Sequence, residues 1–126
     1  MKADLHNHSY YSDGVLSPSQ VVKLASEAEC DLFSLTDHDT TDGIEEAQLE
    51  AKKLNLNLIN GVEISAFWRN MPIHILGLGI DINNDILQTG LEHNQKLRKE
   101  RAEKIALGLW RSGIKDALEK TQSFSK

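Results

Sequence analysis

Six side chains of the types that bind metal ions follow, or lie within, the predicted strands of this 126-residue chain. Imidazole and carboxylate groups together are common ligands of zinc, manganese and iron. The six residues are His6, His8, Asp13, His38, Glu63 and His74. Because the ends of successive parallel strands meet at one rim of an α/β fold, we expect these groups to converge. The pattern predicts the active site of a metalloenzyme.

The first two histidines, His6 and His8, are separated by a single residue. In an extended chain, side chains two positions apart point to the same side, so both imidazoles can reach one cation. The pair directly follows a predicted strand, and Asp13 lies on the next loop. The alternative interpretation of Asp13-Gly14 is an ordinary turn.

The third histidine, His38, stands between two acids, Asp37 and Asp39. We expect one of these carboxylates to hold the ring nitrogen that does not bind the metal, which would fix the tautomer. Capping of the next helix is the alternative role for such acids.

The remaining two ligand-type residues are Glu63 and His74. Glu63 ends a predicted strand, where one carboxylate could bridge two cations. His74 lies within an apolar strand, where an imidazole costs desolvation energy unless it is paired or coordinated. Taken alone, His74 would more often be a hydrogen-bonded core histidine, so the prediction rests on all six residues together.

The elements that must position these residues alternate between strands and helices. Ser17-Pro18 is a typical helix start, with a capping serine and a proline in the first turn. The predicted order is strand 2–5, a helix from Ser17-Pro18, strand 32–35, helix 43–54, strand 56–64 and strand 72–80. This alternation is typical of a parallel sheet with right-handed crossovers. The last strand is apolar on both faces, which predicts that it is covered on both sides.

Two helices are expected to follow, at 84–112 and about 114–121, before a polar tail at 122–126. The predicted buried stripe of the long helix is Ile86, Leu87, Leu91, Ile105 and Leu109. The same helix carries a basic stretch interleaved with glutamates, which we interpret as a solvated face with i,i+4 pairs. A phosphate contact from Arg98 or Arg101 is the alternative. His93 is expected at the surface or in packing.

Length and charge exclude several classes of protein. About 200 residues are needed for a closed (β/α) barrel, so we expect the chain to be the front part of a larger protein rather than a small open sheet. No apolar run reaches the roughly 18 residues of a membrane span. A net charge of −5 argues against general binding of duplex DNA, but not against a small phosphorylated substrate held on metals. Cys30 is the single cysteine, which predicts a reducing compartment, by default the cytoplasm.

The motifs form an ordered set along the chain. They are His6-x-His8, Tyr11-Ser12-Asp13-Gly14, Thr36-Asp37-His38-Asp39-Thr40, Gly61-x-Glu63-Ile64 and His74. This set, which covers residues 3 to about 80, resembles the motifs of the PHP (polymerase and histidinol phosphatase) phosphoesterase family. The segment Arg98-x-x-Arg101-Ala102-x-x-Ile105, ending at Gly113-Ile114, resembles the branch of 3′,5′-nucleotide bisphosphate phosphatases and 5′→3′ exoribonucleases (RNase AM).

The resemblance implies a fold and a set of ligands. Residues 1–83 would form the N-terminal portion of a distorted, TIM-like (β/α)₇ barrel, and 84–126 a helical segment that begins an insertion. Two or three divalent ions are implied, with manganese expected and iron, zinc or magnesium as alternatives. By analogy, His6 and His8 hold the first ion, and Glu63 bridges it to a second ion bound by His74. Asp13 and His38 hold the third.

The resemblance also implies an activity, the metal-dependent hydrolysis of a phosphomonoester. The expected substrate is the 3′-phosphate of a nucleoside 3′,5′-bisphosphate, extending to short RNA from its 5′ end. Water activated by the metals would replace a protein nucleophile. A histidinol-phosphate-type phosphatase is one alternative. A non-catalytic metal-binding or interaction module is another, because the family's late histidine and terminal Asp-x-His are absent from this sequence.

Overall fold

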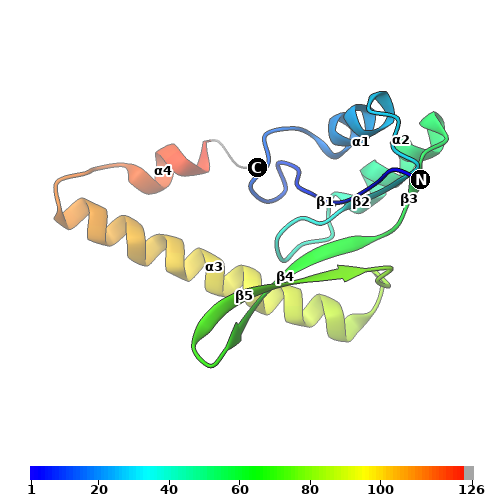
Figure 1. Cartoon of the computed structure of the whole chain (residues 1–126). Coiled ribbons are helices and arrows are strands. Elements are labelled where there is room, and N and C mark those ends of the chain that lie inside the picture. The colour runs from blue at the N-terminus through cyan, green and yellow to red at the C-terminus, as the bar shows by residue number, and fades with distance from the viewer. Residues whose placement is uncertain (124–126) are drawn as a thin grey trace.

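The computed structural model describes residues 1–123, which form a layered α/β unit with a long helix running past it (Figure 1). The elements are β1 (Ala3–Asn7), α1 (Pro18–Glu27), β2 (Leu32–Leu35), α2 (Ile44–Leu54), β3 (Asn57–Leu58), β4 (Gly61–Trp68), β5 (Met71–Leu78), α3 (Asp85–Arg111) and α4 (Ala117–Gln122). Positions 124–126 of the expected polar tail lie outside the described residues. The alternation of strands and helices up to β3 is confirmed.

The first sheet is parallel, as predicted, with the order β1-β2-β3. Asp4 pairs with Phe33 and Asn7 with Leu35, so β1 carries one residue more than β2 over this stretch. Such a bulge bends a strand and re-aims its side chains, and it is common beside active sites. Here it lies in the segment that contains His6.

The single strand expected at 56–64 is wrong, because the chain turns at Asn60 and forms two strands. The backbone carbonyl of Asn60 accepts a hydrogen bond from Gly79 N–H, and its side-chain carbonyl accepts one from Gln48. From Gly61 onward, β4 pairs with β5 as an antiparallel hairpin. Arg69 and Asn70 at its tip both have positive φ, which is the backbone of a tight two-residue hairpin turn.

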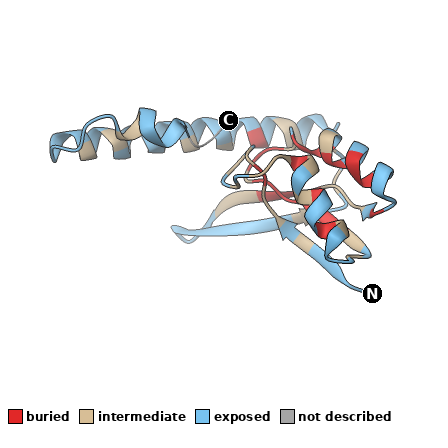
Figure 2. Cartoon of the chain, turned by 90° about the horizontal axis from the view of Figure 1, so that it is seen from above, coloured by how far each residue is buried: buried red, intermediate tan, exposed pale blue. Residues whose placement is uncertain are grey.

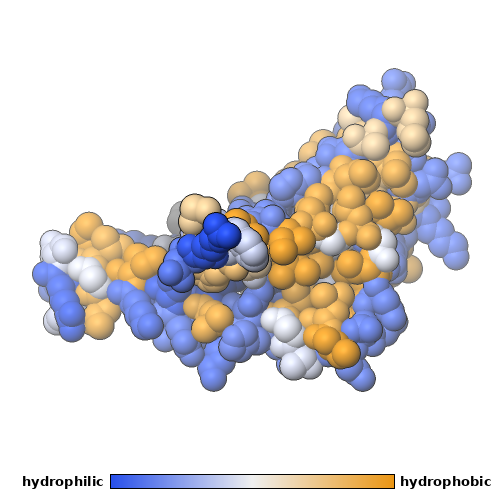
Figure 3. All heavy atoms as spheres, turned by 60° about the horizontal axis from the view of Figure 1, so that its bottom comes forward, coloured by the Kyte–Doolittle hydropathy of each residue, from blue (hydrophilic) through white to orange (hydrophobic). Residues whose placement is uncertain are grey.

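The expectation that the strand at 72–80 is covered on both sides is also wrong within the described residues. Ile75 is 51% exposed, and apolar side chains of the hairpin gather on the surface (Figure 3). The hairpin's large exposed apolar residues are Phe67, Trp68, Met71, Ile73, Ile75, Leu76 and Leu78. These residues are exposed because the hairpin lies at the edge of the fold. Among the described residues, β5 pairs with β4 alone, and β4 is joined to the first sheet by one bridge, between His38 and Glu63.

The core lies between β2 and the two helices that cover it, α1 and α2 (Figure 2). Small alanines on both helices allow close packing over Phe33 and Leu35. The core cluster consists of Val22, Ala25, Phe33, Leu35, Ala47, Ala51 and Leu56. Ser17 caps α1 with a complete capping box and Pro18 opens the helix, as the sequence predicts. The core therefore fixes the strand from which the loop carrying His38 emerges.

The long helix α3 has nearly the predicted length, but its predicted buried stripe is only partly confirmed: Leu87 and Leu109 are half-buried. Within α3, Leu91 is buried, whereas Ile86 and Ile105 are 85% and 56% exposed. Asn94 and Gln95 in the first half of α3 donate hydrogen bonds to Asp39 in the loop after β2, and the second half of the helix extends away from the sheets beside α4 (Figures 1 and 2). None of the helices in the described part of the chain is both long enough and apolar enough to cross a bilayer.

Replacing Gly61 should destabilise the fold where β4 begins. A Cβ at this position would lie 2.3 Å from Ser34 Oγ and 2.7 Å from Thr36 Cγ2. Thr36 cannot move freely because it exchanges hydrogen bonds with the backbone of Asn7. We expect Gly61→Ala to lower the free energy of urea unfolding by about 1–3 kcal/mol.

The matched control for this substitution is Gly90→Ala, in α3, where nothing lies within 4 Å of an added Cβ. This variant should gain about 0.5–1 kcal/mol of stability, because alanine favours a helix over glycine. Equal effects of the two substitutions would contradict the close packing at Gly61.

Candidate metal centre

The structure brings all six predicted ligand residues together. They form three groups in which potential ligand atoms lie within 4.8 Å of one another: His6, His8 and Glu63; His8, Asp13 and His38; and His38, Glu63 and His74. His8, His38 and Glu63 each belong to two groups. The sequence analysis gave such a shared role to Glu63 alone, and the sharing of His8 and His38 comes from the packing of separate loops around this carboxylate.

Glu63 is the centre of this arrangement, with a side chain only 7% exposed. Its Oε2 lies 2.8 Å from His6 Nε2 and 3.0 Å from His8 Nε2, and its Oε1 lies 2.7 Å from His74 Nδ1. Burial would raise the pKa of Glu63, but hydrogen bonds and positive charge from the histidines outweigh it and lower the pKa. Glu63 is therefore a carboxylate, able to face more than one cation.

The position of Glu63 differs from the prediction that it ends a strand. It is the third residue of β4 and forms a parallel bridge with His38: Glu63 N–H donates to the Asp37 carbonyl, and Asp39 N–H donates to the Glu63 carbonyl. His74 lies in the middle of β5, where Ser65 is its cross-strand partner. Glu63 and Ser65 are two apart and so share a face, which brings His74 diagonally against the carboxylate.

His8, Asp13 and His38 form the second group. Asp13 Oδ1 lies 3.2 Å from His8 Nδ1, and its Oδ2 lies 3.4 Å from His38 Nε2. Asp13 is presented by a tight loop in which Ser12 and Gly14 both donate backbone hydrogen bonds to the Ser9 carbonyl. Only glycine fits at position 14, because a Cβ there would lie 2.5 Å from the carbonyl oxygen of His8.

His38 has a buried ring nitrogen that no described protein group satisfies with a hydrogen bond. Its Nδ1 is buried and has no hydrogen-bond partner among residues 1–123, with Glu63 Oε2 3.7 Å away. Burial lowers the pKa of His38 below its ordinary value of 6.5, although Glu63 and Asp13 act to raise it. A neutral imidazole with an unpaired nitrogen is the form that binds a metal ion. The donor set and this orphaned atom together fit a cation site.

The acids beside His38 do not hold its ring, contrary to the sequence-based expectation. The carboxylate of Asp37 lies on the other side of the extended chain from the imidazole. Asp39 instead has a left-handed backbone, with φ 54°, and its carboxylate contacts Ser65 and Asn94. The carboxylate of Asp37 accepts hydrogen bonds from Ser9 N–H at 2.7 Å and from the hydroxyls of Ser9 and Ser12 at 2.6 Å. Asp37 thus ties the loop after β1 to the loop after β2.

Asp39 makes the corresponding connection on the other side. It is fully buried, and its carboxylate accepts hydrogen bonds from Ser65 N–H at 2.8 Å, Ser65 Oγ at 2.6 Å and Asn94 Nδ2 at 2.9 Å. Burial would raise the pKa of Asp39, but these bonds and the nearby Arg98 lower it. The serines and Asn94 were not identified from the sequence, since such residues are common in any loop or helix.

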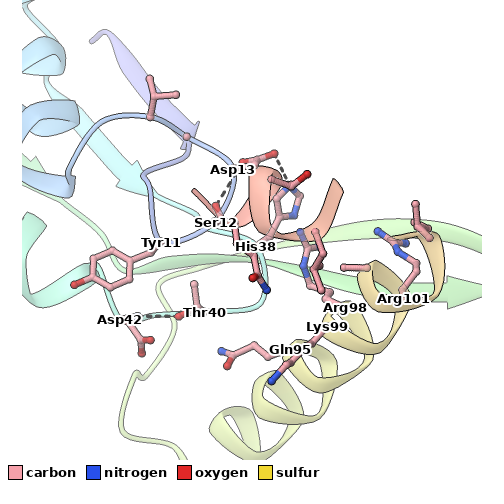
Figure 4. Close-up of a pocket in the computed structure, with 17 residues that line it drawn as sticks. Tyr11, Ser12, Asp13, His38, Thr40, Asp42, Gln95, Arg98, Lys99 and Arg101 are labelled. Atoms are coloured by element: carbon pink, nitrogen blue, oxygen red, sulfur yellow. Dashed lines mark hydrogen bonds and ion pairs between the residues drawn. The ribbon is translucent and has the colours of Figure 1, made fainter. Parts of the chain in front are cut away.

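A cleft of about 940 Å³ opens beside the second ligand group. Asp13 and His38 lie on one wall, and Gln95, Arg98, Lys99 and Arg101 of α3 lie on the other (Figure 4). Part of the basic stretch therefore faces the ligand groups, as the phosphate-contact alternative requires. His93 is exposed and belongs to none of the three ligand groups.

The fold and the site define the class of protein. The PHP domain family matches residues 4–109, so the chain belongs to this family, as its motifs indicate. The predicted fold class, part of a TIM-like α/β PHP fold, is confirmed. A solved amidohydrolase structure from Chromobacterium violaceum, with bound sulfate and no metal, superposes on the whole chain with a TM-score of 0.95 and 36% sequence identity. The chain covers 44% of that protein.

Two curated relatives are similar in sequence. The 5′-3′ exoribonuclease Rnm of Escherichia coli is 42% identical over 98% of this chain, and the 3′,5′-nucleoside bisphosphate phosphatase of Chromobacterium violaceum is 41% identical over 88%. The matches cover 43% and 39% of these relatives. The chain thus spans about two fifths of their length.

The contacts of Asp37 predict how the loop that carries Asp13 is held. In Asp37→Asn, an NH₂ group replaces one of the two acceptor oxygens. At least one of the donors from Ser9 and Ser12 therefore loses its hydrogen bond to the carboxylate. We expect the free energy of unfolding to fall by about 1.5–3 kcal/mol, and the amides of Ser12 and Gly14 to exchange hydrogen faster.

The control is Glu27→Gln, the same loss of charge at an exposed position near the end of α1. It should leave both measurements nearly unchanged. Unaltered exchange at Ser12 and Gly14 in Asp37→Asn would show that Asp37 does not hold this loop.

Proposed function

We propose that the chain carries the metal centre of a hydrolase that releases phosphate from a phosphomonoester. The proposed substrate is the 3′-phosphate of nucleoside 3′,5′-bisphosphates, with degradation of short RNA from its 5′ end as an extension. The observation that carries the proposal is the set of three ligand groups that overlap through His8, His38 and Glu63. The names of the two relatives, a bisphosphate phosphatase and an exoribonuclease, favour nucleotides over histidinol phosphate.

The six converging residues are our proposed ligands of two or three divalent cations. Manganese is the proposed ion, with iron, zinc and magnesium as alternatives. Mixed imidazole and carboxylate groups suit these metals, and the unpartnered Nδ1 of His38 supports coordination there. When bound, such cations supply an activated water as the nucleophile and neutralise charge on the phosphoryl oxygens.

The chain's own groups have distinct roles in this proposal. Glu63 and His38 form the buried floor of the site, with side chains 7% and 10% exposed, and His6, Asp13 and His74 form its more open rim. Arg98 and Arg101 face the site from α3 and would bind phosphate oxygens, for which guanidinium groups are well suited.

The division of the chain at residue 83 is also a proposal. The hairpin ends the part that carries the ligand residues, and α3 brings a polar and basic face to it. We propose that α3 and α4 begin an insertion that provides the substrate side of the cleft.

Metal content tests the proposed ligands directly. Glu63→Gln removes the negative charge that faces three histidines, so we expect at least one manganese ion per chain to be lost after desalting, as measured by inductively coupled plasma mass spectrometry. The control is His93→Ala, which removes the one histidine outside the ligand groups and should retain the wild-type content. Equal metal content in all three proteins would refute the assignment of Glu63 as a ligand, and no ion or one ion per chain in the wild type would favour a non-catalytic module.

Phosphate release tests the activity. The complete gene product, supplied with manganese, should release phosphate from 3′,5′-bisphosphate nucleotides. His8→Ala should reduce the rate at least about a hundred-fold, since His8 belongs to two ligand groups and loss of essential ligands removes metal-dependent chemistry. Chelation should abolish release, and His93→Ala should not. Release that survives both chelation and His8→Ala would exclude this mechanism.

A further inference from the structure

Asp39, beside the proposed ligand His38, contacts Arg98 on α3. Arg98 Nη1 lies 3.5 Å from Asp39 Oδ2 and 3.4 Å from Ser65 Oγ. The carboxylate is fully buried, whereas the arginine side chain is 36% exposed. The guanidinium therefore has one side against a fixed anion and the other open to solvent.

The surroundings of Asp39 fix its position before Arg98 is considered. Its two oxygens accept three hydrogen bonds from Ser65 and Asn94, and its backbone carbonyl accepts one from Gln95 Nε2 at 2.8 Å. Asn94, Gln95 and Arg98 lie on adjacent turns of α3. The loop after β2 thus holds the helix at the turn that carries Arg98.

The open side of Arg98 faces the space beside the histidines. Arg98 lines the cleft that contains Asp13 and His38, and also a second cavity of about 430 Å³ that contains His74. An anion held in either space would meet a guanidinium whose orientation is already set.

We propose that Asp39 is a positioning residue that orients Arg98 to bind a phosphate group of the substrate. This inference rests on the proposed function and adds a role that differs from holding the ring of His38. A free arginine must lose side-chain entropy when it binds an anion, and an arginine held by a buried carboxylate has already lost most of it. Asp39 should therefore act on phosphate only through Arg98.

A double-mutant cycle with inorganic phosphate as the probe tests this coupling. Binding of phosphate to the manganese-loaded chain is measured by isothermal titration calorimetry. Arg98→Ala should weaken binding about ten-fold or more, as expected for loss of a charge-assisted hydrogen bond. Asp39→Asn should weaken it about three- to ten-fold in the wild type and have no effect in the Arg98→Ala background. Arg98→Lys should recover part of the affinity, and Arg111→Ala, at the exposed end of α3, should leave it unchanged.

Two further measurements keep the result interpretable. Manganese content should be the same in Asp39→Asn and wild type, and its loss would overturn the proposal by making Asp39 a general structural residue. Equal weakening by Asp39→Asn in both backgrounds would do the same. If Asp39→Asn does not fold, Ser65→Ala, which removes the hydroxyl between Asp39 and Arg98, should give a smaller effect that again depends on Arg98.

The outcome is separable from that of the proposed function. Suppose that nucleotides release no phosphate, but Asp39→Asn weakens phosphate binding only when Arg98 is present. This result would refute the activity and leave the Asp39–Arg98 coupling in place. Phosphate release with additive effects of the two substitutions would support the activity and refute the coupling.

Discussion

The site depends on one buried carboxylate in contact with three imidazoles that come from two distant parts of the chain. Glu63 meets His6 and His8, around the end of β1, and His74, in the middle of β5. A buried carboxylate is costly unless hydrogen bonds or positive charge compensate it. The parallel bridge between Glu63 and His38 fixes where the charge lies, so the same pairing that joins the two sheets also sets the centre of the ligand groups.

Two buried aspartates hold the loops around this centre with the same pattern of hydrogen bonds. On either side of His38, a buried aspartate accepts one bond from a serine N–H and one from the same serine's hydroxyl: Asp37 from Ser9, and Asp39 from Ser65. The two carboxylates point away from the imidazole, that of Asp37 toward the loop after β1 and that of Asp39, whose backbone is left-handed, toward β4 and α3. His38 therefore lies between two anchored neighbours, and its ring remains available for a ligand.

The residue types and their order were enough to predict the parallel strands and the convergence of the six residues, because both depend on local patterns. Three features depended on contacts between distant segments and were not predictable in this way. The turn at Asn60 separates β3 from β4, which pairs with β5 in a hairpin, so Glu63 and His74 converge from within strands rather than from strand ends. The exposure of Ile75 and Ile105 reflects missing packing partners among the described residues rather than sequence pattern. The partners of Asp37 and Asp39 are serines whose importance only the fold reveals.

The distribution of charge explains how an acidic chain can still suit an anionic substrate. The net charge of −5 describes the whole surface, but attraction of a ligand depends on the field within the cleft it enters. One wall of the cleft carries Arg98, Lys99 and Arg101, and the carboxylates nearest the other wall face histidines. Each divalent cation bound there would add two positive charges and reverse the local sign. The polar attachment of α3 is then more than a way to pack a helix, because it places basic side chains opposite the ligand groups, where an anion would need them.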